Sequence, residues 1–167
     1  MQRVFTIGYE GASLDDFIAT LQLADIDVLL DVRELPISRR KGFSKTALGQ
    51  ALAQAGIAYQ HEKRLGSPSP IRRRLHEDGD YSVFFRDFRC HLEAQSALLA
   101  QLAEDVTGNV ALMCFERDPT TCHRSVVAEA LEALLDVSPK HLGVKRHASK
   151  QESNASRAHL GQGVPAA

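Results

Sequence analysis

Short apolar runs typical of β-strands alternate with amphipathic helical segments along most of this chain. The strand-like runs cover residues 4–7, 28–32, 57–60 and 110–115. The second run is apolar except for Asp31, as expected of a strand that is covered on both faces. Alternation of this kind makes parallel, right-handed strand–helix–strand units. The pattern therefore predicts an α/β fold, in a single layered domain with a mostly parallel sheet flanked by helices.

The helical segments carry recognisable start and stop signals. Ser13 is a favourable N-cap, and apolar residues follow it at the i, i+3, i+4 and i+7 positions of one helix face. Ser44 is the predicted N-cap of a second helix, and Gly56 follows it as a C-terminal stop. A further helix carries inward-facing apolar residues between positions 126 and 135.

The middle and the end of the chain depart from this alternation. Residues 66–81 hold two prolines and two glycines, so we expect a long loop there with a helical turn near residues 72–75. Residues 83–104 keep helical spacing, as one helix or two. The chain has 167 residues, the size of one domain. Apolar residues become scarce near the end, which predicts an α/β domain over residues 1–144 and a disordered tail over residues 145–167.

Composition narrows the classes of partner and compartment. The net charge is -1, so bulk charge favours neither nucleic acid nor a membrane surface. No apolar run approaches the roughly 20 residues of a spanning helix, and no signal peptide is expected. The cysteines, Cys90, Cys114 and Cys122, do not resemble the disulfide framework of a secreted protein. We expect reduced thiols, a cytoplasmic location and no membrane association.

Basic residues gather where the predicted strands end. In a parallel sheet the loops that leave the carboxyl ends of the strands meet at one edge, where ligands bind. Between Arg33 and Arg74 the chain has ten Lys and Arg residues against two Glu. An anionic substrate is the natural occupant of such an edge, whereas the alternative is that these side chains only solvate long loops. The candidate substrate-binding residues are Tyr9, Arg33, Ser38, Arg39, His61 and Arg124.

A second concentration of reactive groups surrounds the start of the last predicted helix. Cys122 lies there, next to His123 and Arg124. A helix N-terminus and two basic neighbours lower a thiol pKa and make the thiolate a nucleophile. His123 is a candidate general acid or base, or a cap of the preceding loop. Cys114 lies within an apolar strand and is more typical of a small core residue.

Two carboxylates at strand ends complete the candidate catalytic group. Glu116 and Asp31 would transfer protons if the site raised one carboxyl pKa, or would pair with Arg33 or Arg124. The candidate catalytic residues are Cys122, His123, Glu116 and Asp31.

Other site signatures are weak. Cys114, Cys122, His123 and His61 would make a Cys2His2 set, but their spacing is atypical of zinc sites, and we assign no metal and no cofactor. The segment at residues 8–11 lacks the glycine spacing of a dinucleotide-binding loop, and there is no Walker motif. The end of the second strand resembles the Asp-x-Arg of rhodanese-like domains, but no Cys-x5-Arg cradle follows.

Several short blocks occur in order along the chain: Thr6-Ile7-Gly8, Asp31-Val32-Arg33 with Pro36 and Ser38-Arg39, Gly56-Ile57 with Tyr59 and His61, Leu65-Gly66, and Leu112-Met113-Cys114 with Glu116, Pro119 and Cys122-His123-Arg124. Together they resemble the domain of unknown function 488 family over about residues 4–135. The resemblance implies a compact α/β domain and no established reaction. The polar residues that recur in the family correspond to Arg33, Ser38, Arg39, His61, Cys114, Glu116, Cys122, His123 and Arg124. Ser67-Pro68-Ser69-Pro70 departs from the usual pattern, which has a second glycine and a basic stretch there.

The sequence thus predicts an enzyme that acts on a phosphate-bearing substrate, a nucleotide or nucleic acid, at the carboxyl edge of the sheet. A non-catalytic nucleic-acid-binding module is the alternative, in which arginines contact phosphates while Phe43 and Tyr9 stack on bases. A weaker alternative is a protein whose basic loops meet an acidic partner.

Overall fold

The fold is built on one parallel sheet. The structure, a computed structural model, describes residue 1 and residues 3–146. The five strands lie in the order β3-β2-β4-β1-β5, and every neighbouring pair is parallel. The strands are β1 (Arg3–Gly8), β2 (Val28–Asp31), β3 (Ala58–His61), β4 (Asn109–Cys114) and β5 (Lys140–Leu142). The predicted α/β class and the four predicted strands are confirmed, and β5 is an additional edge strand.

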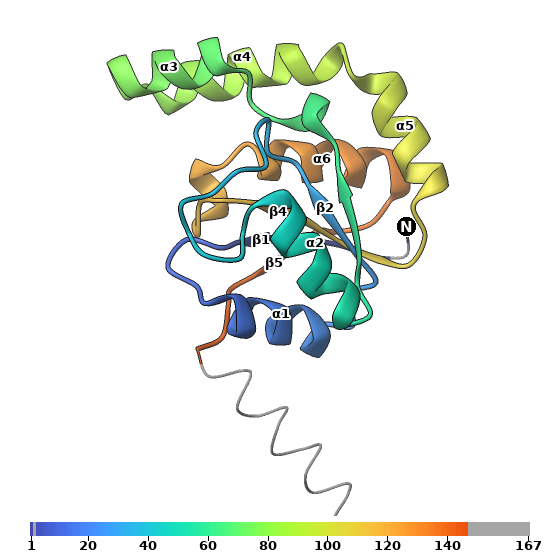
Figure 1. Cartoon of the computed structure of the whole chain (residues 1–167). Helices are drawn as coiled ribbons and strands as arrows, with labels where there is room; N and C mark the ends of the chain where they lie inside the picture. The colour runs from blue at the N-terminus through green and yellow to red at the C-terminus, as the bar shows by residue number, and fades with distance from the viewer. Residues whose placement is uncertain (2, 147–167) are drawn as a thin grey trace, which may run out of the picture.

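Helices cover both faces of the sheet (Figure 1). They are α1 (Leu14–Leu23), α2 (Lys45–Gln54), α3 (Ser69–Asp78), α4 (Tyr81–Glu93), α5 (Ser96–Asp105) and α6 (Arg124–Leu135), with short 3-10 helices η1 (Lys63–Leu65) and η2 (Pro119–Thr121). The Ser13 side chain accepts a hydrogen bond from the Asp16 backbone N–H, which confirms the predicted N-cap of α1. Residues 83–104 form parts of two helices, separated near Ala94.

Two apolar cores lie on opposite faces of the sheet. Phe17 of α1 and Leu52 of α2 pack in the core on one face. Phe88 of α4 and Leu131 of α6 pack in the core on the other face. Leu52 and Leu131 are fully buried, as the periodicity of their helices predicts.

The segment predicted as a long loop contains the helix α3. Pro70 lies in its first turn, where a missing N–H costs no hydrogen bond. Gly79 ends the helix in the left-handed conformation at φ 68°, which glycine adopts without strain. No residue of α3 is buried, and its apolar stripe is only Ile71 and Leu75, which is too short to predict more than a helical turn. The helix lies against α4, above the carboxyl edge of the sheet (Figure 1).

The end of the described chain packs against the domain. The Lys145 backbone N–H donates to Thr20 Oγ1 over 3.1 Å. Of the predicted tail at residues 145–167, residues 147–167 lie outside the described residues. In the part of the chain that the structure describes, no helix has the length and apolar composition to cross a membrane.

The topology places a crevice at one edge. The helices that follow β2 and its neighbour β4 pack on opposite faces of the sheet, so the loops that leave these strands diverge. Ligands of open parallel sheets bind at such a point, outside the carboxyl ends of the strands.

Candidate functional site

A cleft of about 880 Å³ opens at this point, and we call it the carboxyl-edge cleft. Its volume is in the usual range for small-molecule sites, roughly 300–1,000 Å³. The loops after β1, β2 and β4 form one side, and α3 with the start of α4 forms the other. Its lining residues are Tyr9, Arg33, Glu34, Leu35, Ile37, Ser38, Arg39, Arg40, Ser67, Arg72, Leu75, His76, Gly79, Tyr81, Phe84, Cys114, Phe115, Glu116, Thr121 and His123.

Beneath the cleft lies a buried ion pair between Asp31 and Arg33. Asp31 Oδ1 accepts from Arg33 Nε over 2.8 Å, and Asp31 Oδ2 accepts from the terminal Nη2 over 2.6 Å. The Tyr59 hydroxyl also donates to Oδ2 over 2.6 Å. Asp31 is fully buried and does not line the cleft, so its carboxylate orients Arg33 rather than facing a ligand.

Arg33 connects this pair to the cleft wall. Its Nη1 donates to the Tyr9 hydroxyl over 3.1 Å and to the Phe43 carbonyl over 2.9 Å. Burial opposes the charged form of Arg33, but the hydrogen bond and charge of Asp31 outweigh that effect and raise its pKa. A guanidinium has five N–H donors, so one N–H of Nη2 has no partner among the described residues, and Arg33 lines the cleft.

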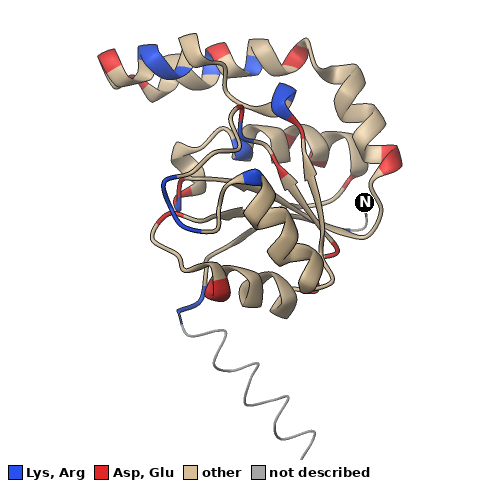
Figure 2. Ribbon diagram, in the orientation of Figure 1, with Lys and Arg blue, Asp and Glu red and all other residues tan. Residues whose placement is uncertain are grey.

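Fewer basic side chains are free of acidic partners at this edge than the sequence count indicates. Four of the ten basic residues have acidic partners: Arg33 with Asp31, Arg64 with Glu62, Arg72 with Glu34, and Arg74 with Asp78 and Asp87. Six are exposed and have no ion pair among the described residues: Arg39, Arg40, Lys41, Lys45, Lys63 and Arg73. Figure 2 shows the basic segment in the loop after β2. Of the six, Arg39 and Arg40 line the cleft.

Ser38 lies next to these two arginines and also lines the cleft. Its hydroxyl oxygen accepts from the Arg40 backbone N–H over 3.1 Å. The Arg40 Nε donates to the Ala12 carbonyl over 2.5 Å, which ties the loop after β2 to the loop after β1. Arg39 makes no hydrogen bond with any described residue, so its charged end is available to a ligand.

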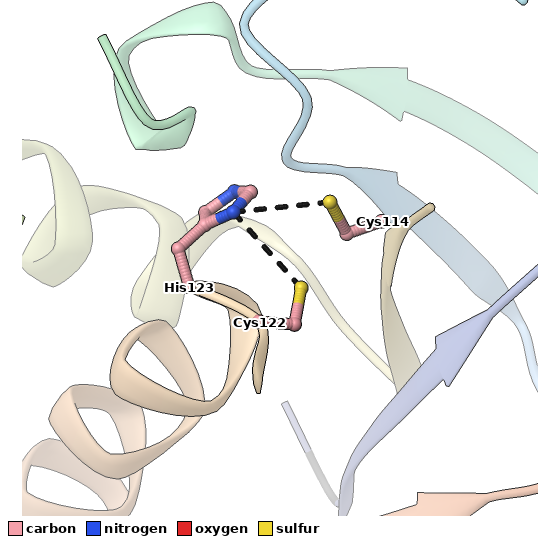
Figure 3. A group of neighbouring side chains, drawn as sticks. All are labelled: Cys114, Cys122 and His123. Atoms are coloured by element: carbon pink, nitrogen blue, oxygen red, sulfur yellow. Dashed lines mark hydrogen bonds between the residues drawn. The ribbon is translucent and has the colours of Figure 1, made fainter. Parts of the chain in front are cut away.

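At the inner end of the cleft, Cys114, Cys122 and His123 form a group that we call the thiol–imidazole cluster (Figure 3). His123 Nδ1 lies 3.8 Å from Cys114 Sγ and 4.0 Å from Cys122 Sγ. The other ring nitrogen, Nε2, lies 2.8 Å from the Val32 carbonyl oxygen. Cys114 Sγ is also 3.2 Å from the Glu116 carboxylate. The structure therefore brings three of the four predicted catalytic residues together.

The predicted pKa of Cys122 is wrong in direction. Burial raises the pKa of the Cys122 thiol well above its ordinary value, and the adjacent Cys114 thiol adds to that increase. Cys122 directly follows η2 and precedes the first residue of α6 by two positions, and burial outweighs any effect of the helix terminus. It does not line the cleft, whereas Cys114 does. The cysteine that a bound substrate could meet is therefore Cys114.

Glu116 and His123 are shifted toward their charged forms. Burial would raise the pKa of Glu116, but hydrogen bonding from Cys122 and Cys114 and the charge of His123 lower it overall. Burial would lower the pKa of His123, but its contacts with Cys122, the Val32 carbonyl and Glu116 raise it overall. The inner end of the cleft thus holds an ionised carboxylate next to a polarised imidazole.

Two predicted substrate-binding residues lie behind the cleft wall. Arg124 is buried and donates to the Glu116 carbonyl over 2.5 Å and the Arg117 carbonyl over 3.1 Å, which fixes the loop after β4. His61 Nε2 lies 2.8 Å from the Arg33 carbonyl oxygen. Neither residue lines the cleft, so each shapes the backbone of a neighbouring loop.

The two aromatic rings predicted to stack on bases stack on each other instead. Tyr9 and Phe43 are buried and stack on each other, with ring centroids 4.4 Å apart. The Tyr9 hydroxyl accepts from Arg33, and Phe43 does not line the cleft. Their rings are therefore part of the core, which corrects the expectation that they contact bases.

Comparison with family models decides which family the chain represents. The model described as Domain of unknown function DUF488 matches residues 13–131. The chain belongs to this family. The DUF488 match runs from the N-cap of α1 into α6 and includes Arg33, Glu116 and the whole thiol–imidazole cluster. A search of curated proteins and a search of solved structures each found no match.

Sequence reasoning missed several cleft residues of this DUF488 domain. Tyr81 and Phe115 line the cleft with 43% and 44% of their surfaces exposed. Ser67 also lines it, and its buried hydroxyl has no partner among the described residues. Phe115 could have been predicted as a cleft residue, because it is an aromatic residue just beyond the end of a strand. Tyr81 and Ser67 depend on how α3 folds, which the sequence did not reveal.

Two glycines allow the loops to approach closely. A Cβ on Gly8 would lie 1.8 Å from the Glu116 carbonyl oxygen, and a Cβ on Gly66 would lie 2.2 Å from the Glu34 backbone nitrogen. Because no side chain intervenes, the loop after β4 packs directly on β1 and carries Glu116 to the cleft.

Proposed function

We propose that this DUF488 protein is an enzyme that binds a phosphate-bearing substrate of nucleotide size in the carboxyl-edge cleft. One observation carries the proposal: two cations without an acidic partner among the described residues, Arg39 and Arg40, line the same cleft as the ionised Glu116 carboxylate. Arginines that share a cleft with a reactive group would hold a phosphate while a different part of the substrate reacts.

Polar groups on the cleft wall support phosphate binding. Arg39 and Arg40 would contact the phosphate oxygens, as guanidinium groups do in a bidentate manner. The last N–H of Arg33 and the unpartnered hydroxyl of Ser67 provide further donors on the wall. A buried hydroxyl without a partner costs stability, so a ligand that accepts from Ser67 would recover part of that cost.

Exposed aromatic rings support a ligand with a planar base. Tyr81 and Phe115 both line the cleft and expose more than two-fifths of their surfaces. Bases stack on such rings with about 1–3 kcal/mol each by alanine substitution. A phosphate and a planar base together describe a nucleotide.

Glu116 is the residue we assign to proton transfer. Its lowered pKa keeps the carboxylate ionised near neutral pH, which is the form of a general base. Both ring nitrogens of His123 are engaged, one by Val32 and the other by the two thiols. Glu116 therefore replaces His123 and Cys122 as the group that meets the substrate.

Ligand-dependent stability tests this proposal. A ligand that binds the native state raises its free energy of unfolding, by about 2.7 kcal/mol at a concentration of 100 Kd. We expect nucleoside phosphates to raise the melting temperature of the full chain, and Arg39→Glu to abolish the increase. Lys63→Glu is the matched control, because Lys63 is equally basic and exposed but lies outside the cleft. No stabilisation by any nucleoside phosphate, or equal loss in both variants, would refute the proposal.

A non-catalytic nucleic-acid-binding module is the second candidate, and the exposed rings of Tyr81 and Phe115 favour it. Such a module would bind single-stranded oligonucleotides more tightly than mononucleotides and would lose affinity steeply as salt rises. Glu116→Gln separates the two functions: it would leave the affinity of a binding module unchanged and would abolish the turnover of an enzyme.

We also propose a cytoplasmic location. The three cysteines are free thiols, the usual state in a reducing compartment. Thiol labelling of the protein directly after lysis of its native cells tests this proposal, and a disulfide-bonded form would contradict it.

A further inference from the structure

The thiol–imidazole cluster has the composition of a metal site. Sγ of Cys114, Sγ of Cys122 and Nδ1 of His123 all lie within 4.8 Å of one another, and all three residues are buried (Figure 3). Thiolate sulfur and imidazole nitrogen are the ligands that zinc prefers in proteins. Two thiolates would also cancel the charge of a divalent ion, which suits a buried position.

The distances agree with a tetrahedral ion. With metal–sulfur bonds of about 2.3 Å and metal–nitrogen bonds of about 2.0–2.1 Å, sulfur and nitrogen lie about 3.6 Å apart. Here Nδ1 of His123 lies 3.8 Å from Cys114 Sγ and 4.0 Å from Cys122 Sγ. Contraction of each of these two distances by a few tenths of an ångström would match the sulfur–nitrogen separation around one ion.

The orientation of His123 supplies an independent observation. A carbonyl oxygen only accepts, so Nε2 carries the proton in its 2.8 Å hydrogen bond to Val32. In the neutral ring Nδ1 then carries a lone pair, which faces the two sulfur atoms. Histidines that bind metals donate their other N–H to a carbonyl or a carboxylate in this way.

The cluster offers three protein ligands, and it lies beside the cleft. Cys114 and His123 line the carboxyl-edge cleft, and Glu116 lies beside them at its inner end. His61, which the sequence offered as a fourth ligand, is directed to the Arg33 carbonyl instead. Three protein ligands with a fourth position open to a cleft are typical of catalytic rather than structural zinc sites.

We propose that Cys114, Cys122 and His123 bind one zinc ion, with its fourth coordination position open to the carboxyl-edge cleft. Bound there, zinc would hold a water molecule or a substrate oxygen next to the Glu116 carboxylate. The inference rests on the proposed function only for what occupies the cleft. Metal binding is measured without a nucleotide. The zinc site can therefore be refuted while the proposed function stands, and the reverse also holds.

Cobalt titration tests the site, because tetrahedral Co²⁺ bound to thiolates absorbs strongly in the visible and has a sulfur-to-metal charge-transfer band. The full chain is reduced, treated with a chelator and titrated with Co²⁺. We expect absorbance that saturates at one equivalent, disappears when Zn²⁺ is added and shifts when azide enters the open position. Bands that ignore azide would refute the open position.

Variants assign the ligands. Cys114→Ala and Cys122→Ala are each expected to weaken Co²⁺ binding at least tenfold, whereas Cys90→Ala leaves it unchanged because Cys90 is exposed and outside the cluster. Circular dichroism checks that each variant is folded.

Alkylation of the wild-type chain is a second test of the zinc site, and it does not require that the variants fold. One equivalent of Zn²⁺ should slow the reaction of Cys114 and Cys122 with iodoacetamide and leave Cys90 unaffected. Absence of saturable cobalt absorbance in the folded, reduced wild-type chain would refute the site, as would a Cys114–Cys122 disulfide that resists reduction.

Discussion

His123 donates a hydrogen bond from Nε2 to the main-chain carbonyl of Val32 over 2.8 Å. This contact joins the N-cap of α6 to the end of β2, two segments that are 91 residues apart in the chain. It fixes the imidazole so that Nδ1 faces Cys114 and Cys122. The arrangement of the thiol–imidazole cluster is therefore a consequence of how the sheet is ordered.

Burial of the Cys122 thiol predicts how stability depends on pH. Because the folded pKa is raised, the unfolded chain loses this proton at a lower pH than the folded chain. The protonated Cys122 thiol therefore makes its full contribution to the free energy of unfolding below the ordinary thiol pKa of about 8.5. That contribution is lost as the pH rises above this value, by up to about 1.4 kcal/mol per pH unit.

Urea unfolding of the chelator-treated, reduced protein between pH 7 and pH 10 (roughly the span around a free thiol pKa) measures this loss. The free energy of unfolding of Cys122→Ala should fall less steeply than that of the wild type. Cys90→Ala, at an exposed cysteine, should match the wild type. Equal slopes for the wild type and Cys122→Ala would contradict the assignment.

The Asp31–Arg33 pair predicts a large difference between buried and exposed ion pairs. Arg33→Ala leaves the fully buried Asp31 carboxylate without its main partner, and such a loss costs about 3–5 kcal/mol. Arg64→Ala removes an exposed partner of Glu62, and because water screens exposed ion pairs it should lower the free energy of unfolding far less than Arg33→Ala does. Chemical denaturation compares the two variants, and a similar cost for both would mean that the buried pair is not the anchor of the cleft wall.

Close packing at Gly8 predicts that a single methyl group disturbs the site. Gly8→Ala places Cβ against the Glu116 carbonyl, and overpacking of this kind costs about 1–3 kcal/mol. Gly143→Ala is the control, because nothing lies within 4 Å of its added Cβ. Thermal unfolding should show a lower melting temperature for Gly8→Ala alone, and an unchanged value would show that the loop adapts freely.

The two cores predict that both helix layers are needed for stability. Leu52→Ala and Leu131→Ala truncate fully buried side chains on opposite faces of the sheet, and each should cost about 2–5 kcal/mol. Leu134 is 51% exposed, so Leu134→Ala should change the free energy of unfolding by only about 0.5 kcal/mol. Urea unfolding of the three variants would contradict the assigned helix faces if Leu134→Ala were the most destabilising.

The central strands and their helices were predictable because each carries its signal locally. β2 is an apolar run, and α1 has an N-cap and an apolar stripe. By contrast, α3 buries no residue, and only Ile71 and Leu75 keep apolar helical spacing, which predicts no more than one helical turn. β5 has three residues, two of them polar, and is defined by pairing with β1. Elements that owe their structure to a neighbour leave little trace in their own residues.

The candidate site was predictable in its residue types and less so in their roles. Parallel topology alone places Arg33, Arg39, Glu116 and His123 at one edge, and all four line the cleft. Which side chains face the cleft depends on packing at atomic detail. Asp31 and Arg124 are used internally, by Arg33 and by backbone carbonyls respectively. No spacing rule reveals that Cys114 lines the cleft and Cys122 does not.

A structure of the full chain bound to the nucleoside phosphate that stabilises it most tests the proposed substrate site directly. We predict the phosphate group at the guanidinium groups of Arg39 and Arg40, and the base against Tyr81 or Phe115. The reacting part of the ligand should lie at the inner end beside Glu116. A ligand bound outside the carboxyl-edge cleft, or one whose phosphate lies away from both arginines, would contradict it.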